Sequence, residues 1–333
     1  MLNVGDDTGG SGTLNVLYST QTLVFSGGGA INIGTAETVG EFYFTGTDEN
    51  FASEQYKMLM NFSGVINVNE MGSFIINGYL PSSYGGSIKI GTLNLRGTLS
   101  TPLTKSSNTY IEINNLNVYE GANLNSSQSL LLSNGGTWNV YSSGITAGRI
   151  RVGAGVINLN GENVLKNVNQ VGMDLDNGAS QLTINMGDYS NVINEFLINK
   201  NSTVNINLDP AKNSVLSILR LTTKENRVWE DGDGATTVNI TNFANDSIFV
   251  GDQNGVTVTD DGRIYIADKN AYMELYAYSD AWINEIVGDW YLEWNDEMGL
   301  FALNNTGAIP EPGACAAAFG VLALAYAARR RRN

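Results

Sequence analysis

The stretch Gly64-Val65-Ile66-Asn67-Val68, or GVINV, holds the pattern that decides the fold. Its two large apolar residues, Ile66 and Val68, flank Asn67 at a spacing of two, so in an extended strand both point to one side and the amide points to the other. Such a strand buries one face and displays an asparagine on the other. Gly64, two residues before the first large apolar position, predicts a tight corner with a positive φ.

The same phrase, Gly-x-apolar-Asn-aliphatic, recurs along the chain. Complete copies and copies without the glycine place asparagine at positions 15, 32, 67, 94, 117, 139, 158, 185, 205 and 239. Successive positions are 17 to 35 residues apart, which is near the length of one coil of a β-solenoid, whose strands bury their apolar face against the coils above and below. Stacked coils would set the asparagines in one outward column, either as a simple amide ladder or as a binding face.

The sequence therefore predicts an all-β fold: a right-handed parallel β-solenoid (β-helix) over residues 1–208. After Asp209, strand-like runs alternate with Asp-Gly and Asn-Gly turns, and four of the five tryptophans lie between Trp229 and Trp294. This texture predicts a β-rich capping unit of hairpins over 209–306. One insertion carries apolar residues that could form a helical stripe, namely Phe51, Tyr56, Leu59 and Met60.

Composition argues against several classes of function. The chain has 18 Lys and Arg against 33 Asp and Glu, and without the four tail arginines and Glu311 its net charge is −18. Such a body repels nucleic acid, so we expect no nucleic-acid partner. There is no histidine, and the single cysteine, Cys315, lies in the tail. The commonest general base and a cysteine-rich zinc site are thus missing, and we expect no catalytic residue, no metal and no cofactor.

Weaker patterns leave other chemistry open. The acidic turns at 231–234 (DGDG) and 259–263 (TDDGR) fit ordinary β-turns better than a calcium loop. Asp174 and Asp176 could form the carboxylate pair of a glycan-cleaving enzyme. Several aromatic residues could stack on sugar rings or belong to the core and cap: Tyr276, Tyr278, Trp282, Trp290, Tyr291 and Trp294.

The end of the chain has three ordered parts. Glu311 lies between Pro310 and Pro312, which favours an extended and accessible backbone. Residues 314–328 carry no charge, and a helix of that length reaches only about 22 Å, less than the ~30 Å of a bilayer core. The arginine cluster follows as Arg329, Arg330, Arg331 and Arg332. It would stop transfer and stay cytoplasmic.

Residues 307–333 resemble the PEP-CTERM sorting signal of exported proteins in Gram-negative bacteria. The resemblance implies an exosortase as processing partner, cleavage near Pro310-Glu311-Pro312, and transient inner-membrane anchoring through a short hydrophobic helix at 314–328. It also implies release or attachment at the cell surface, often alongside exopolysaccharide. The repeat region is loosely similar to the β-helical passengers of autotransporters. The opening MLNVGDDTGG lacks the features of an export signal, so we expect that signal to be missing from this chain.

Together these patterns predict a non-enzymatic, exported structural or adhesive protein of the cell surface or extracellular matrix, with polysaccharide as an open partner. Two alternatives remain at this point. One is a β-helical polysaccharide lyase or hydrolase, and the other is a permanently tail-anchored membrane protein with a transmembrane helix.

Overall fold

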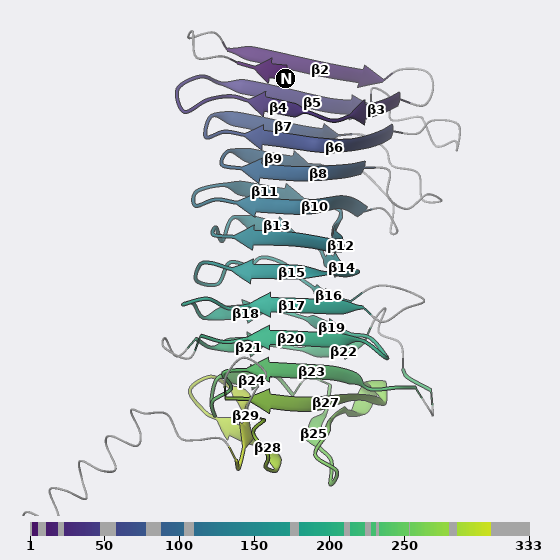
Figure 1. The fold of residues 1–333 in the computed structure, drawn as a ribbon, viewed down its shortest axis with the longest axis vertical. Coiled ribbons are helices and arrows are strands. Elements are labelled where there is room, and N and C mark those ends of the chain that lie inside the picture. Colours follow the sequence, from purple (N-terminus) through teal and green to yellow (C-terminus); the bar gives the residue numbers. More distant parts are fainter. Residues whose placement is uncertain are drawn as a thin grey trace, which may run out of the picture.

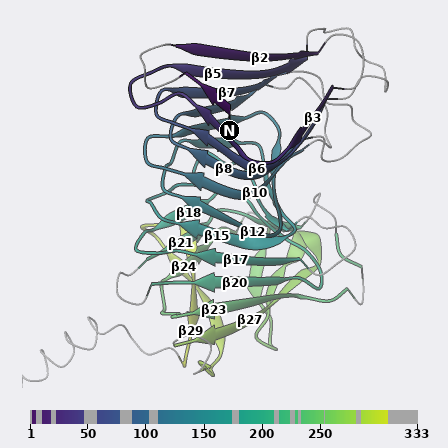
Figure 2. The same cartoon turned by 45° about the horizontal axis from the view of Figure 1, so that its top comes forward.

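The chain folds into a tall stack of β-strands, shown in the computed structural model of Figure 1. The rotated view in Figure 2 shows the same strands rising one above another from β27 to β2. The structure describes the following residues: 2–5, 11–18, 23–46, 58–77, 88–102, 110–173, 180–209, 214–223, 228–230, 233–252, 254–279 and 285–307.

Three sheets form the stack. The largest has eighteen strands: β1 (Leu2–Val4), β3 (Leu23–Gly27), β4 (Ala30–Ile33), β6 (Met58–Val68), β8 (Ile88–Leu95), β10 (Tyr110–Val118), β12 (Ser129–Val140), β14 (Ile150–Val152), β15 (Ala154–Leu159), β16 (Val171–Met173), β17 (Gln181–Asn185), β19 (Phe196–Ile198), β20 (Thr203–Asn207), β22 (Leu221–Thr223), β23 (Thr236–Thr241), β25 (Val256–Val258), β26 (Ile264–Ile266) and β27 (Ala271–Tyr278). The second has six: β2 (Gly12–Tyr18), β5 (Gly40–Gly46), β7 (Gly72–Asn77), β9 (Thr98–Thr101), β11 (Asn123–Ser126) and β13 (Ile145–Ala147). The third has five: β18 (Asn191–Ile193), β21 (Leu216–Ile218), β24 (Ile248–Val250), β28 (Trp290–Asn295) and β29 (Leu300–Asn305). A short 3-10 helix, η2, covers Ala267–Lys269.

The coils contribute one or two strands to the large sheet, and most contribute one strand to a smaller sheet. Equivalent strands of successive coils pair in parallel. Strands β6, β8, β10 and β12 are in register through their repeated phrases, so that Ile66, Leu93, Leu116 and Trp138 stack. All four side chains are fully buried. The predicted all-β, parallel, solenoid-like fold is thus confirmed.

A continuous apolar core runs along the stack because the strands alternate between buried and partly exposed residues. Strand β7 shows this pattern, with Phe74 and Ile76 buried. The ring of Phe42 in β5 stacks on that of Phe74, with centroids 5.0 Å apart. A coil therefore buries its apolar face only against its neighbours, as expected of stacked repeats.

The phrase glycines are needed for close backbone approach and not, in most copies, for a positive φ. Only Gly29 has a left-handed backbone, with φ 99°, whereas Gly64, Gly91, Gly136 and Gly155 do not. A Cβ on Gly64 or Gly91 would lie well inside van der Waals contact of a carbonyl oxygen of the preceding coil. The prediction of positive φ at these corners is therefore wrong, because crowding between coils, rather than a turn, selects glycine there.

Parallel pairing continues past Asp209. Strand β23 pairs in parallel with β20 and β27, and β24 pairs in parallel with β21. Antiparallel pairs then close this end: β25 with β26, β26 with β27, β28 with β29, and β29 with β24. The predicted antiparallel hairpins therefore exist, and they cover core edges that would otherwise be exposed.

Two local predictions are corrected by the structure. Leu59 and Met60 belong to strand β6 and not to a helix, and Met60 alternates with the buried Phe62 in the strand pattern; Phe51 and Tyr56 lie outside the described residues. Asn15 lies in β2 of the six-stranded sheet, opposite Tyr43, and is not part of the asparagine column.

The hydrophobic helix predicted at 314–328 lies outside the described residues. Within the ranges that the structure covers, no helix has the length and apolar character of a membrane span.

Candidate functional site

A column of asparagine side chains runs along the outer face of the eighteen-stranded sheet. Each Nδ2 donates to the Oδ1 of the asparagine in the preceding coil. The eight bonds measure 2.5 to 2.8 Å and join Asn3, Asn32, Asn67, Asn94, Asn117, Asn139, Asn158, Asn185 and Asn207 in that order. A ninth bond of 2.6 Å, from Thr241 Oγ1 to Asn207 Oδ1, extends the column by one more coil. The predicted outward column is confirmed as an unbroken amide ladder.

The column arises because parallel, in-register pairing stacks identical residues. An amide has both a donor and an acceptor, so a copy of itself one coil away is a suitable partner. The ladder follows Asn185 to Asn207 rather than to the predicted Asn205, because Asn207 is the residue opposite Asn185 in the β17–β20 pairing. Asn239 lies opposite Asn205 and is therefore also outside the ladder. The ladder continues from Asn207 to Thr241, two residues further along β23.

We expect Asn117→Ala to lower the free energy of unfolding by about 1 to 2 kcal/mol, because it leaves the partly buried amides of Asn94 and Asn139 each without one partner. Asn15→Ala, an exposed asparagine outside the column, should change it by less than about 0.5 kcal/mol. Urea unfolding of the two variants tests the ladder. Equal losses would show that it contributes nothing.

A second polar column lies beside the first, but only toward the C-terminal end of the stack. Asn239 Nδ2 donates to Asn205 Oδ1 at 2.9 Å, and Asn205 Nδ2 donates to Thr183 Oγ1 at 3.3 Å. In the coils above, the equivalent positions are mixed: Ala30, Val65, Thr92, Asn115, Thr137 and Val156. A shallow cavity of about 410 Å³ opens where the two columns run together, lined by Thr183, Asn205, Asn207, Asn239 and Tyr278.

Both columns end on tyrosine. In the β23–β27 pairing, Asn239 lies opposite Tyr276, and Thr241 lies opposite Tyr278. Tyr276 is exposed and Tyr278 partly exposed. The neutral, amide-lined surface therefore finishes in two neighbouring phenol side chains on one strand.

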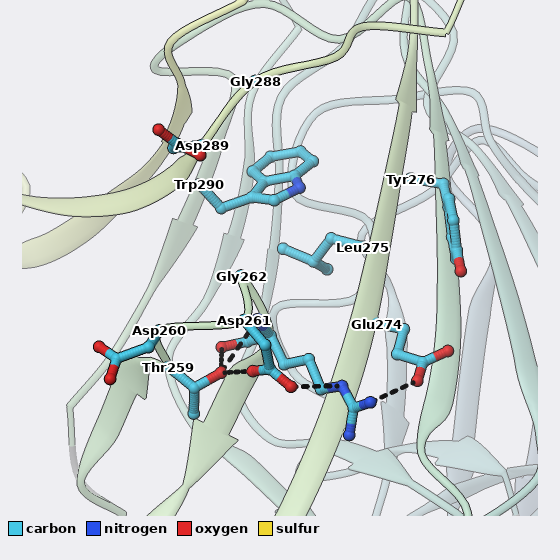
Figure 3. Close-up of a pocket in the computed structure, with 11 residues that line it drawn as sticks. Thr259, Asp260, Asp261, Gly262, Glu274, Leu275, Tyr276, Gly288, Asp289 and Trp290 are labelled. Carbon is cyan, nitrogen blue, oxygen red and sulfur yellow. Dashed lines mark hydrogen bonds and ion pairs between the residues drawn. The ribbon is translucent and has the colours of Figure 1, made fainter.

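A groove of about 560 Å³ lies at the lower edge of β27 and is drawn in Figure 3. It lies between the 259–263 turn, β27 and the start of β28. Carboxylates surround it on Asp260, Asp261, Glu274 and Asp289, and Trp290 and Leu275 form its apolar side. The guanidinium of Arg263 bonds Asp261 at 3.2 Å and Glu274 at 3.4 Å, and it is the sole cation among the lining residues.

The 259–263 turn is held by its own side chains, as expected of an ordinary β-turn. The Thr259 hydroxyl donates to Asp261, and the Gly262 amide donates to the Thr259 carbonyl at 2.9 Å. The hydrogen bond from Thr259, helped by the charge of Arg263, holds the pKa of Asp261 below its ordinary value. Asp261 thus stays ionised, whereas the acid of a glycoside hydrolase needs a raised pKa. Within the described ranges, no three His, Cys, Asp or Glu side chains are grouped so that they could hold a metal.

A third cavity, of about 530 Å³, is lined by residues of β6, β8, β10 and β12 around Gly91. An ion pair of 2.8 Å crosses it between Lys89 of β8 and Glu112 of β10, and the hydrogen bond to Glu112 raises the pKa of Lys89. The guanidinium of Arg151 lies 5.1 Å from the ring centre of Tyr110. The ion pair joins neighbouring strands, and the Arg151–Tyr110 contact reaches across β12, so we interpret both as links between coils.

The remaining predicted residues divide into two groups. Trp290 contacts the core and packs edge-on against Phe243 at 5.0 Å, and Trp294 packs against Phe301 at 5.1 Å, so both have structural contacts in the cap. The second group lies outside the described residues: Asp174, Asp176, Trp282, Pro310, Glu311, Pro312, Arg329, Arg330, Arg331 and Arg332. The groove was missed because Arg263 and Glu274 are brought together only by the β26–β27 hairpin.

Comparison of the chain with protein-family models, with curated proteins and with solved structures gives no match.

Proposed function

We propose that this chain is a structural or adhesive rod of the cell surface or extracellular matrix, built as a right-handed parallel β-solenoid. The observation that supports a rod-like structural role is the unbroken asparagine column, because one continuous ladder along the stack resists bending and slippage between coils. The low fraction of charged residues, 15% of the chain, agrees with a surface made for packing rather than for steering charged substrates.

The proposed cellular location depends on the C-terminal tail. We infer that Pro310-Glu311-Pro312, the apolar run 314–328 and Arg329–Arg332 act together as a PEP-CTERM-like sorting signal, so that an exosortase removes the tail after transient inner-membrane anchoring. The apolar run is shorter than the hydrocarbon core of a bilayer, which disfavours a permanent transmembrane helix, and the arginines favour a cytoplasmic C-terminus. Polysaccharide is the partner that fits such a location.

The proposed sorting signal is tested by expressing the chain behind an export signal in a Gram-negative host that has an exosortase. The parent protein should be found at the surface or in the medium without its C-terminal tail, as read by mass spectrometry of its two ends. Glu311→Ala, and a variant with all four tail arginines changed to serine, should accumulate with intact tails in the inner membrane. Glu293→Gln, an exposed acid of β28, is the matched control and should be processed like the parent.

Two results would contradict this assignment. Normal release of both tail variants would mean that the tail is not the sorting signal. Intact C-terminal peptides of the parent in washed membranes would instead indicate a permanent tail anchor.

A further inference from the structure

We propose that the face made by Thr183, Asn205, Asn207, Asn239, Tyr276 and Tyr278 binds an uncharged polysaccharide. We call it the asparagine–tyrosine face. This inference deepens the proposed surface function by naming what the rod would hold, and it is independent of the tail.

The amides of this face keep hydrogen-bonding capacity. Asn205 uses one N–H toward Thr183 and one lone pair toward Asn239, and Asn207 uses one of each toward Asn185 and Thr241. Each primary amide has two N–H groups and two lone pairs. A donor and an acceptor therefore remain on each amide, beside a cavity that leaves room for a ligand.

The spacing of the face suits a chain of sugar rings. Equivalent residues of neighbouring coils are separated by about 4.8 Å, the distance between paired strands. A β-linked pyranose unit has about the same length, so a glycan lying along the stack would present hydroxyl groups to Thr183, Asn205 and Asn239 in turn. Because the amides are fixed by their ladder bonds, little side-chain entropy is lost on binding.

The tyrosines supply the apolar contact that sugars need. Strand β27 has four outward residues, and its last two are tyrosines: Tyr276, which is 39% exposed, and the partly exposed Tyr278; Tyr272 and Glu274 precede them. A phenol ring offers a flat apolar face and a polar edge, which matches the C–H face and the hydroxyl rim of a pyranose. The pair lies directly below Asn239 and Thr241, so polar and aromatic contacts follow one another along one line.

Charge decides which glycans fit. The residues that line the cavity between the columns are all uncharged. Tyr276 also lines the neighbouring groove under β27, which has the carboxylates of Asp260, Asp261, Glu274 and Asp289 against the single cation Arg263. A polyuronate would be repelled by this neighbour and by the net charge of the chain, −15. Acidic glycans are therefore disfavoured, and the cavity lining itself offers no carboxylate to a cationic one, so an uncharged glycan fits the face best.

The test uses the purified full chain and isothermal titration calorimetry. The probes are uncharged β-linked hexasaccharides of glucose, xylose and mannose, a galacturonic acid hexamer, and a chitosan hexamer. At least one uncharged probe should bind, and its affinity should be nearly the same at 0.05 M and 0.5 M salt. The Debye length falls about threefold over this range, which would weaken a charge-driven contact.

Variants identify the surface. Tyr276→Ala should weaken binding about tenfold and Asn239→Ala about fivefold, as expected for one aromatic and one hydrogen-bonding contact. Tyr291→Ala is the matched control, because Tyr291 is 38% exposed but lies on β28 outside the face. Asn94→Ala, in the main ladder several coils away, controls for the loss of amide–amide hydrogen bonds between coils. Thermal melting of each variant confirms that it is folded.

The proposal is overturned if no uncharged probe binds, if only a charged probe binds, or if Tyr276→Ala binds like Tyr291→Ala. Each of these results leaves the sorting of the tail unaffected, and a failure of tail processing leaves glycan binding unaffected. The two proposals can therefore fail separately.

Discussion

Replacing Trp138 by alanine is expected to lower the free energy of unfolding by about 4 kcal/mol, within the 3 to 5 kcal/mol typical of large buried aromatic residues. The Trp138 side chain is fully buried near the middle of the stack. Its indole nitrogen donates to the carbonyl of Ile113 in the preceding coil, at 2.9 Å. The substitution thus creates a cavity between β10 and β15 and leaves one buried carbonyl with fewer partners.

Urea unfolding followed by circular dichroism measures this loss, and Trp138→Phe should fall between the parent and alanine because it keeps most of the volume but not the N–H donor. Trp294→Ala is the control. Trp294 is 51% exposed and contacts Phe301 at the surface of the cap, so its loss should cost less than about 1.5 kcal/mol. A Trp138→Ala variant as stable as Trp294→Ala would show that the stacked core does not carry the stability of the rod.

Gly91→Ala is expected to cost about 3 kcal/mol, at the upper end of the range for overpacked sites. The added methyl group would lie against the backbone carbonyl of Ser63 in the preceding coil. Ser63 lies in an irregularity of β6 between the paired residues Phe62 and Val65, which hold it on both sides. This loss arises in the folded state and is net of a smaller gain, up to about 1 kcal/mol, that alanine gives by restricting the unfolded chain.

Gly148→Ala provides the comparison. No atom lies within 4 Å of the position that its Cβ would take, and its backbone is not left-handed. Alanine there should leave stability unchanged or raise it by up to about 1 kcal/mol. Urea midpoints of the two variants measure the difference. If Gly91→Ala were as stable as Gly148→Ala, close approach between coils would not be the reason for glycine in the repeated phrase.

The parallel architecture could be predicted because one short phrase determines several levels at once. In Gly64–Val68 the alternation of Ile66, Asn67 and Val68 predicts a strand with one buried face, and repetition of the phrase predicts stacking. Both are confirmed. The same alternation describes any strand buried on one side, however, and it therefore could not exclude Asn15, which lies in the six-stranded sheet.

Other features depend on register, which a short phrase cannot decide. The run Val204-Asn205-Ile206-Asn207 has two asparagines at a spacing of two, so both point outward, and only the pairing with Asn185 places Asn207 in the ladder. The short apolar run at Met58–Met60 suited a helix or a strand equally, and packing against β3 and β8 favours the strand. The groove under β27 joins residues from the turn, the strand and β28, and no local pattern marks their meeting.

The ladder also has an electrical consequence. Every amide from Asn32 to Asn207 donates its N–H toward the preceding coil, and every amide from Asn3 to Asn185 accepts from the following one. Backbone dipoles in a sheet largely cancel, but these side-chain dipoles all point the same way and polarise one another. The rod therefore has a positive end at the first coil and a negative end near β27, so that rods lying side by side attract when they run in opposite directions.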